Sequence, residues 1–318
     1  MRFIEQINDW SRQRVPFIFI IDFELQKPIA YRLSDIDPQE LLFDINGVSN
    51  AIVPASTGSV VTFERNPISF NEYKHKFQVV AEALHRGESY LTNLTIETPV
   101  SSNMSLQELF FAVRAKYKLW FRNEFLVFSP ESFVKIDNNQ IFSFPMKGTI
   151  DASLPNARQA ILDDEKEEAE HVTIVDLIRN DLSLVADNVK VNRFRYIDEL
   201  KTMDKTLLQV SSEISGNIKP NLALGDLLMA LLPAGSISGA PKKRTVQVIK
   251  AAEQQERGYF TGVFGIFDGE RVDSGVMIRF IERTPRGLIY RSGGGITAMS
   301  NAEQEYDEAI HKVYAPVY

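Results

Sequence analysis

Short apolar segments separated by tight turns run through most of the 318-residue chain, and they constrain its fold most strongly. Residues 15–33 read as two strands, and Asp268-Gly269 is a favoured two-residue hairpin turn between two more. Turns of this kind join neighbouring antiparallel strands. Helical segments lie between the groups of strands. We therefore expect an α+β fold in which antiparallel β-sheets pack against helices.

Capping patterns place the first helices. Ser69 with Glu72 opens a helix that runs to His85, and the pattern from Ser105 opens one that ends near Tyr117. The longest helical segment spans 156–185, and its apolar second half, residues 172–184, is expected to be buried. The other expected helices are 222–231, 242–256 and one from 300 onward, and the other expected strands are 90–100, 119–123, 125–129, 133–144 (bent at 137–139), 189–196 and 206–215.

One further expected strand follows Pro285-Arg286-Gly287. Residues 34–66, rich in Pro, Asn, Ser and Gly, form the least regular part of the chain. The sequence contains no internal repeat and no clear linker. We expect one domain over residues 1–318, with 1–70 as a shortened N-terminal segment and 71–318 as the catalytic region.

Composition excludes several classes of function. Hydrophobic residues make up 44% of the chain, enough to bury a large core, and the net charge of -7 argues against a nucleic-acid-binding surface. The chain has no cysteine, which excludes disulfides, thiolate zinc sites and cysteine nucleophiles. The apolar run 15–21 is too short to span a bilayer and lacks a signal-peptide cleavage site. We expect a soluble, cytoplasmic protein.

The stretch Phe144 to Thr149 is the first candidate for chemistry. A strand is expected to end at Pro145, Lys147 follows at once, and Gly148 lets the backbone turn. Such a position can direct an ammonium group into a cleft. Desolvation disfavours the charged form of a lysine, and a neutral lysine is a nucleophile. The alternative is an ordinary exposed lysine at a strand end.

Three glutamates suggest a metal site. Glu170 lies where the charged half of the long helix meets its apolar half, and Glu305 and Glu308 share one face of the last helix. Carboxylates that converge from two helices suit a hard cation such as Mg²⁺. The alternative is that each is a solvated surface glutamate.

Two further features suggest anion binding. The triplet Gly293-Gly294-Gly295 can expose backbone N–H groups, or it can simply form a tight turn that needs positive φ. Arg279 lies in an otherwise apolar expected strand, 276–281, and needs a carboxylate partner from the protein or from a ligand. The glycine-rich segment 235–242 lacks the spacing of a phosphate-binding loop.

Eight collinear motifs over roughly residues 70–314 resemble the chorismate-utilising enzymes. They are Ser129-Pro130-Glu131-Ser132-Phe133, Pro145-Met146-Lys147-Gly148-Thr149, Ala169-Glu170-His171, Val175-Asp176-Leu177-Ile178-Arg179-Asn180-Asp181, Gly235-Ser236-Ile237-Ser238-Gly239-Ala240-Pro241-Lys242, Ile278-Arg279, Gly293-Gly294-Gly295-Ile296 and Glu305-Tyr306-Asp307-Glu308. The resemblance implies the fold of the anthranilate synthase component I type. Met146 stands where isoleucine is usual, a volume-conserving change.

Within this family, the lysine before Gly-Thr resembles the aminodeoxychorismate synthases (component I) of para-aminobenzoate and folate biosynthesis, because anthranilate synthases typically carry alanine there. The resemblance implies that chorismate is aminated at C4 to 4-amino-4-deoxychorismate. It implies Glu131 as general acid, Mg²⁺ as cofactor, and a covalent adduct of Lys147 with ring carbon 2 that ammonia displaces by adding at C4. Glu131 must then be protonated and Lys147 neutral.

The resemblance also assigns the remaining site residues. Glu170 and Glu308 would hold Mg²⁺ against the ring carboxylate of chorismate, with Glu305 as a further ligand or close neighbour. Asn93 would orient the incoming ammonia. The substrate carboxylates would be held by Gly148, Thr149, Arg279, Gly293, Gly294, Gly295 and Lys312.

Because the family's usual route to ammonia from glutamine needs a cysteine, a separate glutamine amidotransferase subunit is expected, replaceable by free ammonia in vitro. Relatives usually carry a longer N-terminal region, so a tryptophan site is not expected here. The alternatives are an anthranilate, isochorismate or salicylate synthase on the same fold, and a non-catalytic subunit that docks an amidotransferase.

Overall fold

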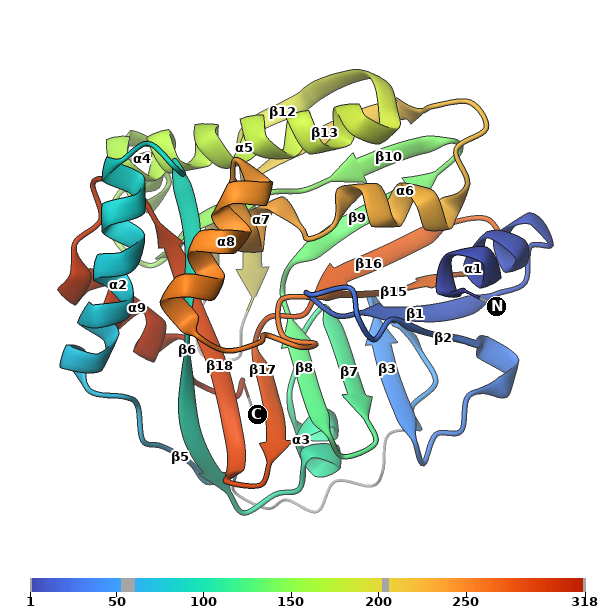
Figure 1. Cartoon of the computed structure of the whole chain (residues 1–318), viewed down its shortest axis with the longest axis horizontal. Coiled ribbons are helices and arrows are strands. Elements are labelled where there is room, and N and C mark those ends of the chain that lie inside the picture. The colour runs from blue at the N-terminus through green and yellow to red at the C-terminus, as the bar shows by residue number, and fades with distance from the viewer. Residues whose placement is uncertain (1, 53–60, 202–205, 317–318) are drawn as a thin grey trace.

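The computed structural model describes residues 2–52, 61–201 and 206–316, so part of the irregular segment 34–66 lies outside it. Two nine-stranded antiparallel sheets form the described part of the chain, with helices on their outer faces (Figure 1). The expected α+β architecture is therefore confirmed. No helix in the described ranges combines the length and apolarity that a bilayer-spanning helix needs.

The first sheet contains the strand with Lys147. Its path is β11 (Met146–Asp151), β13 (Thr206–Ile218), β10 (Gln140–Ser143), β9 (Ser132–Asp137), β16 (Val272–Val276), β15 (Val263–Phe267), β1 (Phe17–Ile21) and β2 (Ile29–Arg32), while β12 (Ala186–Lys201) also pairs with β13. Every residue of β1 is buried, because Phe17 and Phe19 face the helices while Ile18 and Ile20 face the second sheet.

The second sheet contains the glycine triplet. Its path is β14 (Gly239–Ala240), β6 (Leu91–Ser102), β18 (Gly287–Ile296), β17 (Phe280–Thr284), β8 (Phe125–Ser129), β7 (Tyr117–Phe121), β3 (Leu41–Ile45) and β4 (Val48–Ser49), while β5 (Phe63–Arg65) pairs with β6. Aromatic and branched side chains of the two sheets pack together, among them Phe43, Val127, Phe264 and Phe280.

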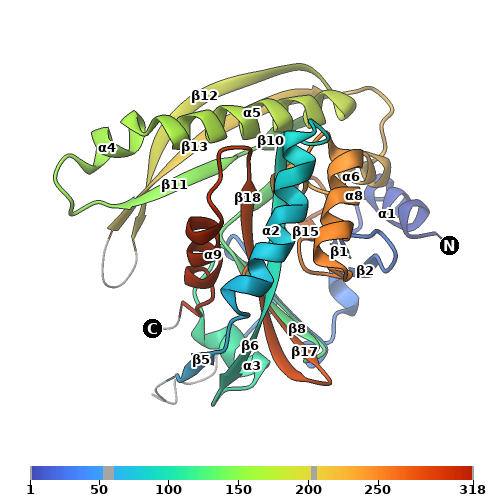
Figure 2. The ribbon, with the colours of Figure 1, turned by 60° about the vertical axis from the view of Figure 1, so that its left-hand side comes forward.

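Helices cover the outer faces and frame the site. Both views show α5 lying across β12 and β13, and α2, α8 and α9 grouped at the β6–β18 end of the second sheet (Figures 1 and 2). The helices are α1 (Phe3–Arg12), α2 (Phe70–His85), α3 (Leu106–Ala112), α4 (Ala157–Asp163), α5 (Glu165–Val185), α6 (Leu224–Leu231), α7 (Gly235–Ser238), α8 (Lys242–Glu253) and α9 (Ala302–His311), with a 3-10 turn at Leu33–Asp35.

Local signals located most elements, and long-range contacts changed some of them. The helix from Ser105 ends at Ala112 rather than near Tyr117, because Tyr117 starts β7 and pairs with Ile45 of β3. The expected bent strand 133–144 is a hairpin, β9–β10, whose turn residues Asn138 and Asn139 have positive φ. The expected single helix 156–185 is two helices that meet at Asp164.

Three more expectations were wrong. Helix α1 was not expected, and the predicted burial of 172–184 fails at Val172 and Leu184, which are about half exposed. The segment 276–281 is not one strand, because the chain leaves the first sheet after Val276 and joins the second at Phe280. This crossover brings the two sheets together at the site.

Candidate active site

A cavity of about 500 Å³ opens between the ends of the two sheets, bounded by α5, α7 and α9. Nearly all of the site residues expected from the sequence line it, although they come from distant parts of the chain. The lining includes Asn93, Glu131, Lys147, Gly148, Thr149, Arg279, Gly293, Gly294, Gly295, Glu308 and Lys312. Glu170 of α5 and Glu305 of α9 lie beside this lining, because Glu170 pairs with Lys147 and Glu305 lies close to Gly294.

The strand before Lys147, β10, ends at Ser143, close to the expected end at Pro145, but Lys147 itself lies in a further strand, β11, that was not expected. The register against β13 shifts between Lys147 and Thr149, so Gly148 is the extra residue of a β-bulge, with φ +74. A Cβ on Gly148 would lie 3.0 Å from Glu167 Oε2. Glycine is needed here for its positive φ and for this close approach, and the bulge presents Lys147 to the cavity.

The ammonium of Lys147 is surrounded by carboxylates. Its Nζ lies 2.5 Å from Glu170 Oε2, and the side chain is 29% exposed. Burial alone would lower the pKa of Lys147, but attraction to Glu170, and then to Glu167 and Glu308, outweighs it and raises the pKa. The expected lowering of the pKa is therefore wrong for this structure, which holds Lys147 as an ammonium.

Glu131 meets the requirement for a general acid. It lies in the short link between β8 and β9, where Ser129 Oγ accepts a hydrogen bond from its backbone N–H. Burial raises the pKa of Glu131, while a 2.5 Å hydrogen bond from Ser236 Oγ and the charge of Lys312 act in the opposite direction. The raised pKa keeps the carboxyl group protonated to higher pH, as the sequence-based hypothesis expected.

The acidic residues of α9 face the glycine triplet. A Cβ on Gly294 would lie 3.5 Å from Glu308 Oε1, 3.6 Å from Glu305 Oε2 and 3.7 Å from Lys312 Nζ. Lys312 Nζ also donates to the carbonyl oxygen of Gly293, over 2.9 Å. Small residues in β18 therefore let two carboxylates and an ammonium approach the backbone.

The triplet is not a turn. Gly293, Gly294 and Gly295 are strand residues of β18, paired with Thr95, Leu94 and Asn93 of β6, and none has positive φ. A Cβ on Gly293 would lie 2.2 Å from the carbonyl oxygen of Leu94, so close strand packing requires glycine there. The triplet forms a flat, side-chain-free wall of the cavity.

Arg279 lies at the crossover between the sheets, with φ +54. Such a backbone is uncommon for a residue with a side chain and is found at functional positions. Its Nη1 donates to the carbonyl oxygen of Lys312, over 2.7 Å, and its guanidinium lies 4.6 Å from the ring centre of Tyr314. Among the described residues Arg279 has no carboxylate partner, and it lines the cavity.

Three residues that the sequence reasoning did not identify also shape the site. Glu167 stands one turn before Glu170 on α5, and its Oε2 is buried without a hydrogen-bond partner among the described residues. Its position in a run of charged residues gave no signal. Ser236 holds Glu131, and Arg257 supports the cavity wall from behind, donating to the carbonyl oxygens of Asn93 and Ile237 over 2.8 Å each.

The carboxylates of Glu167, Glu170 and Glu308 are of the chemical type that binds a hard divalent cation. Among the residues with described positions, no three histidine, aspartate or glutamate side chains form a ready-made metal cluster. Mg²⁺ often uses only one or two protein carboxylates and keeps several waters. Glu170 and Glu308 both act on the Lys147 ammonium, and the buried Glu167 Oε2 has no hydrogen-bond partner among the described residues, so the groups around Lys147 are oxygen donors of the kind that Mg²⁺ binds.

The chain is similar in sequence to bacterial proteins, among them an aminodeoxychorismate synthase. An uncharacterized PabA-like protein of Haemophilus influenzae is 50% identical over 317 residues, which cover 99% of this chain and 96% of that protein. Aminodeoxychorismate synthase component 1 of Salmonella typhimurium is 34% identical over 258 residues, which cover 76% of this chain and 56% of that protein. The chain thus spans little more than half of the latter's length.

Solved structures share the fold. Anthranilate synthase component I of Streptococcus pneumoniae matches with a TM-score of 0.67 and 26% identity, over 80% of this chain and 59% of that one. The menaquinone-specific isochorismate synthase MenF of Escherichia coli matches with a TM-score of 0.71 and 15% identity, over 98% and 79%. The model of the chorismate binding enzyme family matches residues 31–317. The chain therefore belongs to the chorismate binding enzymes.

Proposed function

We propose that this protein aminates chorismate at C4 with ammonia to give 4-amino-4-deoxychorismate, through a covalent adduct of Lys147. The observation that carries the proposal is the placement of the Lys147 amine and the Glu131 carboxyl group on one cavity of substrate size. A nucleophile and a general acid on the same cavity are what substitution of a ring hydroxyl requires.

In the proposed reaction, Lys147 acts as a neutral amine, so its ammonium must first give a proton to a neighbouring carboxylate, and Glu170 Oε2 lies 2.5 Å from its Nζ. Its Nζ bonds to ring carbon 2, the ring double bonds shift, and the C4 hydroxyl departs as water with the proton of Glu131. Ammonia then bonds to C4, and the electron pair of the C2–N bond returns to Lys147. The new ammonium group gives a proton to Glu131, which restores both residues.

The substrate carboxylates find complementary groups in the cavity. Arg279 has no protein carboxylate among the described residues, and Lys312 lies against Gly293. Gly148, Thr149 and the glycine triplet also line the cavity, and Gly294 lies beside Lys312. Asn93 Oδ1 is buried and lacks a partner in the described structure, so it can accept an N–H bond from ammonia.

Mg²⁺ would be held by Glu170 and Glu308, with Glu305 and Glu167 as close carboxylates. When bound it would neutralise the negative charge of a substrate carboxylate. The protein's own contribution is to bring these carboxylates from α5 and α9 to one side of the cavity.

Replacing Glu308 by glutamine tests this metal site. Because one hard, charged oxygen ligand is lost, we expect the Mg²⁺ concentration for half-maximal activity to rise by about 10- to 100-fold, the range seen when groups that support a metal are removed. Asp307→Asn removes the same charge from an exposed neighbour outside the cavity lining and should leave the Mg²⁺ requirement unchanged. An unchanged requirement in E308Q would contradict the assignment.

Ammonia would come from a glutamine amidotransferase partner. These 318 residues contain no cysteine, so a cysteine-dependent glutaminase reaction must take place outside them. Free ammonium salts should replace the partner in vitro.

Product analysis tests the proposal directly. The purified chain is incubated with chorismate, Mg²⁺ and an ammonium salt, and the products are identified by mass spectrometry. We expect 4-amino-4-deoxychorismate without release of pyruvate. Anthranilate or salicylate with pyruvate, or isochorismate without incorporation of nitrogen, would each establish one of the alternatives on this fold. No turnover at all would favour a non-catalytic subunit.

The hydrogen bond from Ser236 to Glu131 gives a pH prediction. This bond stabilises the ionised carboxylate, so Ser236→Ala should raise the pKa of Glu131 further. A general acid works while protonated, and the rate falls as pH rises through its pKa. The alkaline limb of kcat should therefore move to higher pH, measured at saturating chorismate and ammonia.

Ser238→Ala is the matched control for this pH profile. Ser238 is buried in the same short helix, but its hydroxyl donates to the carbonyl oxygen of Ala234 and not to Glu131. We expect its alkaline limb to coincide with that of the wild type. If the alkaline limb of the kcat profile stays in place or moves to lower pH in S236A, the pKa of Glu131 does not determine that limb.

A further inference from the structure

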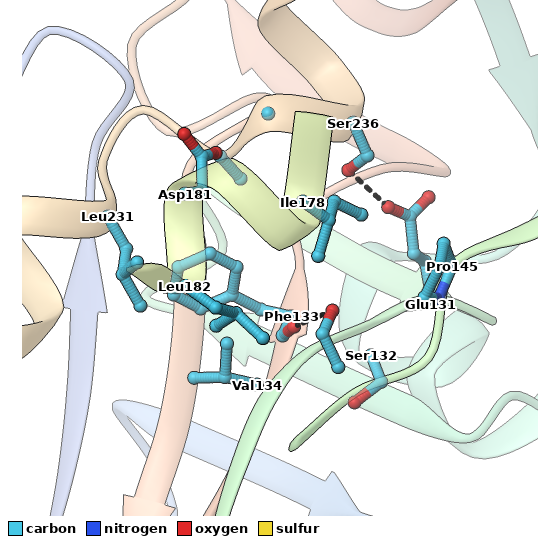
Figure 3. Close-up of a pocket in the computed structure, with 13 residues that line it drawn as sticks. Glu131, Ser132, Phe133, Val134, Pro145, Ile178, Asp181, Leu182, Leu231 and Ser236 are labelled. Carbon is cyan, nitrogen blue, oxygen red and sulfur yellow. Dashed lines mark hydrogen bonds between the residues drawn. The ribbon is translucent and has the colours of Figure 1, made fainter. Parts of the chain in front are cut away.

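A second, much smaller cavity lies directly behind Glu131, which we call the rear cavity (Figure 3). Its volume is about 30 Å³, room for one water-sized molecule. Glu131 and Ser236 line both this cavity and the large one, so their hydrogen bond lies at the boundary between the two. The rear cavity is lined by Glu131, Ser132, Phe133, Val134, Ser143, Pro145, Ile178, Asp181, Leu182, Leu231, Ala234, Gly235 and Ser236.

The lining selects for a small hydrogen-bond donor without charge. Each of its serine hydroxyls already donates within the protein: Ser236 to Glu131, Ser132 to the carbonyl oxygen of Ser274, and Ser143 to that of Phe133. Their remaining capacity is to accept. The other walls are mainly apolar, and the Asp181 carboxylate among them is already paired with Lys242, so the lining offers little to balance the charge of an ion such as ammonium. Ammonia, with three N–H donors and no charge, fits these requirements better than water does.

Asp181 lines the opposite side of the rear cavity from Glu131 (Figure 3). Asp181 Oδ2 pairs with Lys242 Nζ over 2.9 Å, and Lys242 Nζ also donates to the carbonyl oxygen of Leu231. The side chains of Asp181 and Lys242 are 15% and 20% exposed, so the pair touches solvent as well as the cavity lining. A Cβ on Gly235 would lie 2.7 Å from Asp181 Oδ2, so glycine makes room for this carboxylate.

We propose that the rear cavity is the binding site for ammonia, from which ammonia passes Glu131 and Ser236 to reach ring carbon 4. This inference rests on the proposed function. It places ammonia next to the Glu131 carboxyl group, which in the proposed reaction protonates the departing C4 hydroxyl. Glu131, having given its proton to the departing hydroxyl, is then positioned to take the proton that the newly bonded nitrogen loses. The ion pair Asp181–Lys242 closes the outer end.

Enlarging the rear cavity tests the proposal by a gain of function. Val134→Ala removes two methyl groups from the wall, so methylamine should enter as well as ammonia. We expect the ratio of kcat/KM for methylamine to that for ammonia to rise by about 10-fold or more, since one methylene in a fitted pocket is worth roughly 10- to 200-fold. The N-methyl product is identified by mass. Val272→Ala, a buried valine of the neighbouring strand outside the lining, should leave the ratio unchanged.

Filling the rear cavity provides the second test. Ala234→Val adds two methyl groups at a buried position of the lining, so the KM for ammonia should rise while the KM for chorismate stays the same. Circular dichroism confirms that each variant is folded. If the wild type makes the aminated product but neither variant changes amine selectivity or the KM for ammonia, the ammonia site is refuted and the proposed function stands. A wild type that makes no aminated product refutes the proposed function itself.

Discussion

Lys147→Ala should reduce the rate of chorismate amination at least about a thousandfold, because it removes the covalent nucleophile of the proposed reaction. The loss should appear in kcat, since Arg279 and Lys312 remain to bind the substrate carboxylates. Product formation from chorismate, Mg²⁺ and ammonium is the measurement. Amination at the wild-type rate by K147A would exclude the covalent mechanism.

Lys135→Ala is a closely matched control for this experiment. The Lys135 side chain is 28% exposed against 29% for Lys147, and its Nζ pairs with Asp273 over 2.8 Å. It lies on β9, outside the lining of the large cavity. We expect K135A to keep its activity. A fall in K135A as large as that in K147A would indicate loss of structure rather than loss of a nucleophile.

A trapped adduct would identify the bond directly. Acid quenching during turnover, followed by proteolysis, should give the peptide that contains residues 145–149 with the mass of a chorismate-derived ring attached. The same peptide from K147A should carry no added mass. An adduct on another lysine would reassign the nucleophile.

The sequence predicted those parts of the fold that depend on neighbouring residues. Ser105 begins α3 as expected, because a capping box is complete within four residues. The end of α3 was misplaced, because Tyr117 is drawn into β7 by pairing with Ile45, more than seventy positions away in the chain. A propensity argument contains no information on such a partner.

The site shows the same division. Motif order identified Lys147, Glu131 and Glu308, and the structure brings them to one cavity. The sequence could not show that Gly148 forms a bulge, since a bulge is defined by register against β13. It could not show the raised pKa of Lys147 either, because this depends on the distance to Glu170.

Arg279 illustrates why composition alone misled. Its apolar neighbours made 276–281 resemble one buried strand, which would require an internal carboxylate for the arginine. The chain instead changes sheets there, and the guanidinium meets a carbonyl oxygen and an aromatic ring. The same crossover gives Arg279 its positive φ and places it on the cavity wall.

Arg257→Ala should cost about 3–5 kcal/mol of stability, the usual result of leaving one partner of a buried ion pair without the other. Arg257 is 1% exposed, and its Nε and Nη2 contact both oxygens of Glu253 over 2.9 and 2.6 Å. Its remaining bonds hold the carbonyl oxygens of Asn93 and Ile237, two segments of the cavity wall. Thermal unfolding should show a large fall in Tm, and kcat should fall at temperatures where the variant is still folded.

Two further variants separate the effect of charge from that of packing. Arg244 lies on α8, the helix that also carries Glu253. Arg244→Ala breaks its exposed pair with Glu88 and should cost no more than about 1 kcal/mol of stability. Arg257→Met combined with Glu253→Leu removes both buried charges, so stability should recover in part although Thr95 loses its acceptor. Since the double variant still lacks the bonds to Asn93 and Ile237, its activity should stay low even as its Tm recovers. Wild-type kcat in the double variant would show that Arg257 stabilises the fold without positioning the wall of the site.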